Sequence, residues 1–198
     1  MAAAGDERPD EDPGEVEGEE IEEPRLDAEA LARRRIALAQ IRQYPDKVLR
    51  MRAREVESFD ADLARLAERM GALMDDARGV GLAATQVGVL QRLFVFQAEG
   101  EERPRAVVNG RITDRSDELE TMDEGCLSLQ GVHVPVERAL RVRLEGQSIE
   151  GEPFTLDLEE MDARVVQHEL DHLDGVLMLE RTDDASRRDA LATLRRQL

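Results

Sequence analysis

The segment QHELDHLDG, from Gln167 to Gly175, limits the possible folds more than any other stretch of this chain. Its two histidines, His168 and His172, lie four residues apart, so on a helix both imidazoles project from the same face. Neighbouring apolar residues recur at helical spacing and share that inward face: Val165, Val166 and Leu173. We therefore expect a buried helix, capped near Asp162 and ending at Gly175, that directs two imidazoles at another part of the chain.

The same segment also carries a chemical pattern. Glu169 follows His168 directly, which gives H-E-x-x-H, a pattern typical of zinc hydrolases in which two imidazoles bind the ion and the carboxylate carries protons. The alternative is that the pattern arises by chance, because two surface histidines on an acidic helix would look similar in sequence. The chain contains only three histidines, and two of them fall in this pattern, which favours a metal site.

The rest of the chain predicts helices and antiparallel strands. Helical spacing predicts helices over residues 26–43, 60–77 and 183–197, with Asp60 as the N-cap of the second and Gly79 at its end. Apolar runs at residues 93–96 and 106–109 predict two strands. Strict alternation over residues 140–146 and 154–159 is typical of an antiparallel hairpin with one buried face.

Charge divides the chain into a tail and a body. Residues 1–23 contain eleven acids and one base, a net charge of −10 out of −18 for the whole chain. We expect residues 1–24 to form a disordered acidic tail and residues 25–198 to form a single domain. The acidic body argues against duplex DNA as a partner.

The sequence also favours a cytoplasmic location. It has no apolar run near the ~20 residues that a membrane span requires, and its start lacks the features of a secretory signal. The single cysteine, Cys126, excludes an intramolecular disulfide, which suits a reducing compartment.

A catalytic metal needs a third protein ligand, and the sequence offers several candidates. Met178 stands where a metzincin would have its third histidine, and a thioether is a poor ligand there. Glu180 would serve an endopeptidase-like site, although it is only eight residues after His172. Cys126, in EGCLS, would complete a Cys-His-His site that accommodates Fe²⁺ as well as Zn²⁺.

A glycine-rich stretch, GVGLAATQVG from Gly79 to Gly88, is a third candidate site segment. A flexible turn after a helix would have the same composition. Its small residues, Gly81 among them, would let a second backbone or a peptide approach closely, and Gln86 adds an amide donor and acceptor.

The stretches GVGLAATQ, EGCLS and QHELDH together resemble the three motifs of peptide deformylase, in the family's order and at about its spacing. The resemblance extends from about Ile41 to about Arg181. It implies an α+β fold with antiparallel sheets packed around a central metal-binding HExxH helix, flanked by an N-terminal and a C-terminal helix. It also implies that the N-formyl group is removed from the initiator methionine of nascent polypeptides, with release of formate.

The resemblance assigns roles to residues of this chain. One divalent ion, most commonly Fe²⁺ but also Zn²⁺, Ni²⁺ or Co²⁺, would be held by Cys126, His168 and His172. Glu169 would take a proton and pass it to the leaving amine, while Gln86 and the backbone N–H of Leu127 would stabilise the oxyanion. Gly81 would bond the substrate backbone, and the methionine pocket would be lined by Val80, Met122, Val165 and His168. Partners would be formylated, ribosome-associated nascent chains.

Two positions depart from the family pattern. Gln130 stands where a proline is common, and His133 stands where arginine or tyrosine is common. Both concern the expected peptide groove, so they affect substrate preference rather than reaction type. Two other functions stay open: an HExxH endopeptidase with a carboxylate as third ligand, and a catalytically weakened binder at the ribosome.

Overall fold

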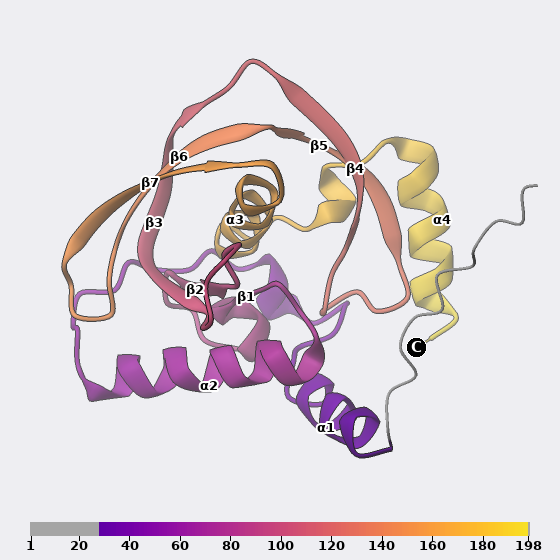
Figure 1. Ribbon diagram of the computed structural model, residues 1–198. Coiled ribbons are helices and arrows are strands. Elements are labelled where there is room, and N and C mark those ends of the chain that lie inside the picture. The colour runs from indigo at the N-terminus through magenta and orange to yellow at the C-terminus, as the bar shows by residue number, and fades with distance from the viewer. Residues whose placement is uncertain (1–27, 198) are drawn as a thin grey trace, which may run out of the picture.

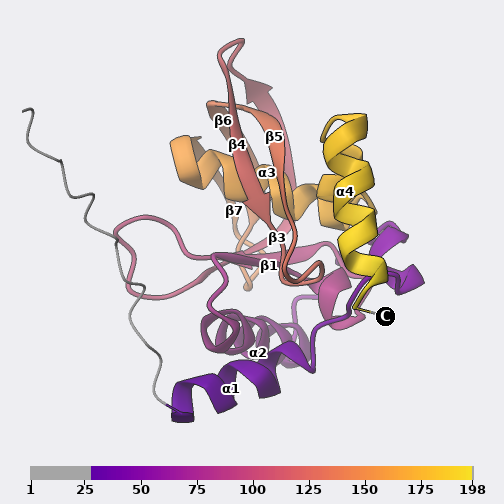
Figure 2. The ribbon, with the colours of Figure 1, turned by 90° about the vertical axis from the view of Figure 1, so that its right-hand side faces the viewer.

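The computed structural model describes residues 28–197 and contains two antiparallel sheets (Figures 1 and 2). The larger sheet has the order β1-β2-β3-β6-β7, and the smaller sheet pairs β4 with β5. The strands of the larger sheet are β1 (Gly81–Ala83), β2 (Leu93–Phe96), β3 (Arg105–Arg115), β6 (Arg141–Gln147) and β7 (Pro153–Glu159). Those of the smaller sheet are β4 (Leu119–Gly125) and β5 (His133–Ala139).

Four α-helices accompany the sheets: α1 (Ala28–Leu38), α2 (Ala61–Ala77), α3 (Glu160–Leu173) and α4 (Asp184–Arg195). Figure 1 views α3 nearly end-on, with strands of both sheets around it. Contacts agree with this view, because α3 touches β1, β2, β3, β6 and β7 of the larger sheet and β5 of the smaller one. Helices α1 and α2 lie against each other below the sheets, and α4 lies beside β5 (Figure 2).

Helix α2 begins and ends where predicted. The Asp60 carboxylate accepts hydrogen bonds from the backbone N–H groups of Asp62 and Leu63, which satisfies two free donors of the first turn. At the other end Arg78, not Gly79, adopts the left-handed conformation, with φ of 60°. The N–H of Gly79 closes the helix by bonding to the Met74 carbonyl. The helix therefore ends at Ala77, as predicted, and its left-handed residue is an arginine.

The helix predicted over residues 26–43 is shorter, because α1 ends at Leu38. Backbone groups after that point bond to distant segments instead of continuing the helix. The N–H of Arg42 donates to the Gln86 carbonyl and the N–H of Tyr44 donates to the Ser128 carbonyl. Residues 26 and 27, like the predicted tail over residues 1–24, lie outside the described residues.

Helix α3 begins two residues before the predicted Asp162 cap. Its N-cap is Glu159, the last residue of β7, and the N–H of Glu160 still bonds to the Leu140 carbonyl. The strand therefore passes into the helix without a loop, so strand pairing rather than a side-chain cap sets the boundary. The Asp162 carboxylate instead accepts from the N–H of Glu99. The predicted end is correct, since Gly175 lies just beyond the helix with φ of 75°.

The predicted β6–β7 hairpin is confirmed, with Leu144 opposite Leu156. The predicted strands over residues 93–96 and 106–109 correspond to β2 and part of β3, and β3 is longer than predicted. The β4–β5 pair was not predicted. Strand β4 reads LETMDEG and buries only Glu124, so it lacks the alternation that reveals a half-buried strand.

The core is mainly aliphatic and falls into three clusters. One joins α2 to β1 and β2, a second fills the space between the larger sheet and α3, and a third lies among β5, α4 and the 3₁₀ segments. Over residues 28–197, no helix combines the length and apolar character needed to cross a membrane.

The sheet core provides a stability test. Leu144 on β6 is fully buried, so Leu144→Ala should lower the free energy of unfolding by about 2–5 kcal/mol through lost burial and a residual cavity. Leu119→Ala is the matched control, because Leu119 lies on a strand but is 53% exposed, and it should cost well under half as much. Urea unfolding followed by circular dichroism measures both. Equal losses would contradict the described packing.

Candidate metal centre

A cavity of about 640 Å³ lies where four parts of the chain meet: α1, the segment from Arg78 through β1, β4 with the residues after it, and α3. Nine of the ten residues to which the family resemblance assigns a role line it: Val80, Gly81, Gln86, Met122, Cys126, Leu127, Val165, His168 and Glu169. The tenth, His172, is buried behind this lining, with 1% of its surface exposed. Gln130 and His133 also line the cavity.

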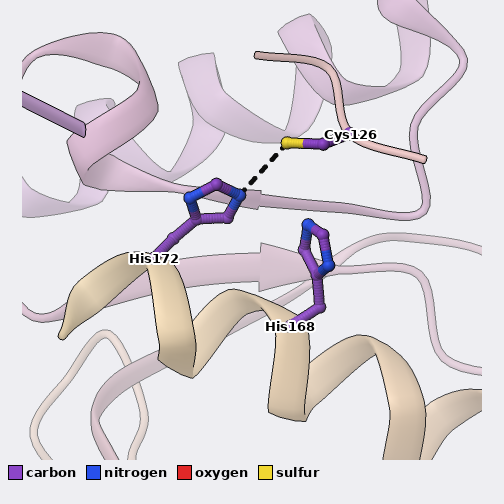
Figure 3. A group of neighbouring side chains, drawn as sticks. All are labelled: Cys126, His168 and His172. Carbon is purple, nitrogen blue, oxygen red and sulfur yellow. Dashed lines mark hydrogen bonds between the residues drawn. The ribbon is translucent and has the colours of Figure 1, made fainter. Parts of the chain in front are cut away.

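The sulfur of Cys126 and the two helix imidazoles come together at the base of this cavity. Figure 3 shows His168 and His172 projecting from successive turns of α3 toward Cys126, which reaches them from a different segment. Cys126 Sγ lies 3.2 Å from His172 Nε2, and one ligand atom from each of the three residues falls within 4.8 Å of the others. One sulfur and two nitrogens at this spacing can share a single ion.

The His168 ring is oriented by a buried carboxylate. Its Nδ1 lies 2.9 Å from Glu124 Oε2, two residues before Cys126 in sequence. That contact occupies Nδ1 and leaves Nε2 as the nitrogen that can serve as a metal ligand. A carboxylate behind a ligating imidazole fixes the ring and raises its basicity, which suits the candidate site to a cation.

Glu124 belongs to a buried network of charged side chains. Arg138 on β5 donates to both of its oxygens, at 3.0 and 2.9 Å, and Arg164 on α3 donates to Oε1 at 2.9 Å. Arg138 also donates a hydrogen bond to the Asp171 carboxylate at 2.5 Å, and Arg181 donates two hydrogen bonds to the same carboxylate, at 3.0 and 2.5 Å. The network therefore ties β4, β5 and both ends of α3 together around the candidate ligands.

This network keeps Glu124 ionised. Burial opposes the charge, but hydrogen bonds from His168 and Arg138 outweigh it and lower the pKa of Glu124 to about 2. Burial likewise opposes protonation of His168, yet its hydrogen bonds with Cys126 and Glu124 raise the pKa of that imidazole. Burial and the neighbouring positive groups lower the pKa of His172. The groups around His168 therefore favour positive charge at this imidazole, and they would favour a bound cation for the same reason.

Gln86 is held with its amide nitrogen toward the sulfur. Its carbonyl oxygen accepts from the Ala83 N–H at 2.8 Å, which fixes which end of the amide points inward. The amide nitrogen lies 3.1 Å from Ser128 Oγ and 3.7 Å from Cys126 Sγ. The Ser128 N–H also points at Cys126 Sγ, at 3.4 Å. The Gln86 amide and the Ser128 N–H are therefore both directed at the Cys126 sulfur.

Gly81 makes room for Glu169. A Cβ added to Gly81 would overlap the Glu169 carboxyl group, so only glycine permits β1 to approach α3 this closely. The sequence predicted that a second backbone or a peptide would approach this stretch closely; the group that lies against Gly81 in the structure is the Glu169 side chain. Within residues 28–197, Glu169 Oε2 is buried without a hydrogen-bond partner, and burial raises the pKa of Glu169 to about 7.

The competing third ligands lie elsewhere. Met178 is buried in the cluster that joins β5 and α4. The Glu180 carboxylate accepts from the Leu177 N–H at 2.9 Å and pairs with Arg50 at 2.9 Å. Among the described residues, the group of potential metal-binding side chains around the two histidines contains Cys126 and neither of these alternatives.

Sequence reasoning missed the network around the ligands. Arg138, Arg164 and Asp171 are each at most 9% exposed, yet in sequence they resemble ordinary surface charges. One signal was available for Arg138: it continues the alternation of VHVPV (residues 132–136), which places it on the same inward face as Val134 and Val136.

Comparison with known proteins agrees with the three motifs. Residues 38–188 match the family described as polypeptide deformylase. The sequence is 43% identical to peptide deformylase 1 of Corynebacterium glutamicum over 81% of this chain and 96% of that protein. It is 46% identical to peptide deformylase of Thermotoga neapolitana, over 74% of this chain and 88% of that protein. This chain belongs to the polypeptide deformylase family.

Solved structures support the same conclusion. The crystal structure of peptide deformylase from Thermus thermophilus superposes with a TM-score of 0.74 at 47% identity, covering 79% of this chain and 93% of that one. The enzyme from Legionella pneumophila gives a TM-score of 0.75 at 36% identity, covering 79% and 92%. The predicted class, helices combined with antiparallel sheets, is confirmed.

The charged network generates a second stability test. Arg138→Met should lower the free energy of unfolding by about 3–5 kcal/mol, because it leaves the buried carboxylates of Glu124 and Asp171 without their shared partner. Arg143→Met is the matched control on β6, the next strand in sequence, where the partner Asp157 is exposed, and it should leave stability nearly unchanged. Denaturant unfolding measures both, and a mild effect of Arg138→Met would argue against the network.

Proposed function

We propose that this chain is a metal-dependent hydrolase that removes the N-formyl group from the initiator methionine of nascent polypeptides and releases formate. The observation that carries the proposal is the meeting of Cys126 Sγ with the two imidazoles of α3 inside a lined cavity. Membership of the polypeptide deformylase family supports it. Residues 25–198 would act as one catalytic domain, in the cytoplasm, on chains emerging from the ribosome.

Cys126, His168 and His172 would hold one divalent ion. A thiolate with two imidazoles suits Fe²⁺ or Zn²⁺; we propose Fe²⁺ as the native ion, with Zn²⁺, Ni²⁺ or Co²⁺ as replacements. The donor set fits such an ion, because the sulfur receives donors from Gln86 and Ser128 and His168 is backed by Glu124. When bound, the ion would supply Lewis acidity that lowers the pKa of water.

Glu169 would carry the proton. It sits in the cavity lining between the two ligand histidines in sequence, and its Oε2 has no partner within the described part of the chain. A carboxylate so placed would accept a proton from the attacking water and return it to the amine that leaves. Gly81 keeps the space for this side chain open.

Two donors would stabilise the oxyanion. The Gln86 amide nitrogen is directed inward because Ala83 holds the other end of the amide. The backbone N–H of Leu127 would be the second donor, and its peptide segment is held by Gln43, which donates to the Leu127 carbonyl at 3.0 Å. Preorganised donors of this kind favour the transition state because they need no reorientation during reaction.

The methionine side chain of the substrate would occupy the apolar part of the cavity. Val80, Met122 and Val165 line it together with His168, and Gly81 would bond the substrate backbone. Val80 is 55% exposed and Met122 is 38% exposed, so both lie where an entering apolar chain would cover them. Burial of such side chains by substrate would contribute to binding.

The Cys126 ligand separates the proposal from the endopeptidase alternative. We expect Cys126→Ala to lose bound metal and formate release from formyl-Met peptides, because two imidazoles alone leave the ion poorly held. Glu180→Gln keeps the acceptor for the Leu177 N–H and should retain both properties. Metal content by mass spectrometry and formate release by a coupled assay test the pair.

The opposite pattern, loss with Glu180→Gln and activity with Cys126→Ala, would favour an endopeptidase with a carboxylate ligand. Mass spectrometry of digested peptides would then show internal cleavage. An intact metal content with no formate release in the unaltered protein would favour the catalytically weakened binder.

The proton carrier has its own test. Glu169→Gln should lower kcat for deformylation by about 10²–10⁴-fold while the metal content stays near that of the unaltered protein. Glu68→Gln, on the exposed face of α2, is the matched control and should leave kcat unchanged. Turnover of Glu169→Gln within a few-fold of normal would show that another group moves the proton.

A further inference from the structure

The candidate active-site cavity continues over α1. A second cavity, of about 370 Å³, lies along this helix and is lined by Leu31, Arg34, Arg35, Leu38, Ala39, Gln43 and Gln130. Three of these residues, Arg34, Leu38 and Gln130, also line the main cavity. The two cavities therefore adjoin each other at α1 and Gln130, and together they are called the groove below.

Arginines without carboxylate partners gather in this groove. Arg34 and Arg78 line the main cavity, and Arg35 lines the second one. Over residues 28–197, no ion pair involves any of the three; Arg164, which also lines the main cavity, is paired with Glu124. The chain as a whole has a net charge of −18. Among the described residues, the second cavity is lined by Arg34 and Arg35 and by no acid, whereas the main cavity is lined by three arginines and three acids.

One of these arginines is fixed in place. Arg34 Nε donates to the Ala77 carbonyl at 3.3 Å, in the last turn of α2, next to Arg78. A cation at a helix C-terminus is favourably placed with respect to the helix dipole, which helps to hold α1 against α2. The main cavity is also lined by the acids Asp123, Glu124 and Glu169, but these lie on β4 and α3, whereas Arg34 and Arg78 lie where α1 meets the end of α2.

Arg34 and Arg35 lie before the residues that match the family, whereas Arg78 lies within them. The family match begins at residue 38, so Arg34 and Arg35 precede it. A ligand preference set by α1 would therefore belong to this chain's own sequence and not to the shared motifs.

We propose that α1 extends the substrate groove and that Arg34, Arg35 and Arg78 form a basic subsite for an acidic side chain in the substrate, downstream of the formyl-methionine. The proposal rests on the proposed function, which places the formyl group at the metal-binding side chains. An extended peptide advances about 3.3 Å per residue, so the residues after methionine leave the main cavity in sequence. A carboxylate meets a guanidinium with paired N–H donors, and this geometry distinguishes glutamate from glutamine.

The test uses formyl-Met tetrapeptide amides with glutamate at the second, third or fourth position and alanine elsewhere, each with a glutamine counterpart. For the full-length protein, kcat/KM should favour glutamate over glutamine at one position by roughly threefold at low ionic strength, the scale of an exposed ion pair. The difference between the glutamate and glutamine peptides should appear in KM rather than in kcat, and it should become smaller as salt is added.

Charge-removing variants locate the subsite. Arg34→Gln combined with Arg78→Gln should abolish the glutamate preference, and Arg35→Gln should reduce it. Arg33→Gln is the matched control on the same helix, because Arg33 pairs with Glu29 and lines neither cavity, and it should keep the full preference. Equal kcat/KM for glutamate and glutamine at all three positions, or a preference that survives the double variant, would overturn the proposal.

Binding separates this inference from the proposed activity. Fluorescence anisotropy of the same peptides, labelled at the C-terminus, measures the glutamate preference whether or not hydrolysis occurs. Hydrolysis without any preference would leave the deformylase function standing and remove the subsite. A binding preference lost in the double variant, but with no formate release, would support the subsite and reject the catalytic function.

Discussion

The candidate site depends on one buried carboxylate. Glu124 lies on β4 and is contacted by Arg138 from β5 and by Arg164 and His168 from α3, so it joins the smaller sheet to the helix. Because Cys126 follows two residues later, fixing Glu124 also fixes where the sulfur can lie relative to the imidazoles. The charge on Glu124 is costly to bury, and its several donors offset that cost. The hydrogen bonds to Glu124 thus hold β4 and β5 against α3, and they also orient His168, a candidate metal ligand.

Local patterns in the sequence were sufficient for elements whose boundaries are set locally. The α2 cap at Asp60 and the β6–β7 hairpin follow from side chains within a few residues of each other. Boundaries set by distant contacts were not predictable in this way. The end of α1 depends on backbone bonds to Gln86 and Ser128, and the start of α3 depends on pairing with Leu140. Strand β4 has little apolar character because its single buried residue is charged.

The candidate site shows the same division. The H-E-x-x-H spacing places both imidazoles on one face, but nothing local indicates which of three candidate ligands would meet them. Resemblance to a known family selected Cys126, and the described geometry brings its sulfur to the histidines. The charged partners of Glu124 escaped notice because a buried arginine and a surface arginine look alike in sequence. Gly81 was recognised as a place of close approach, although its neighbour proved to be Glu169.

The candidate ligands come from parts of the chain that are far apart: 46 residues separate Cys126 from His172. An unfolded chain does not hold such side chains together, so an ion that needs all three would bind the folded state alone. Binding to the folded state shifts the folding equilibrium in proportion to the logarithm of free ligand concentration above its dissociation constant. The metal supply in the surroundings would therefore govern the chain's resistance to heat and proteolysis, and starvation for the ion would lower the amount of intact protein.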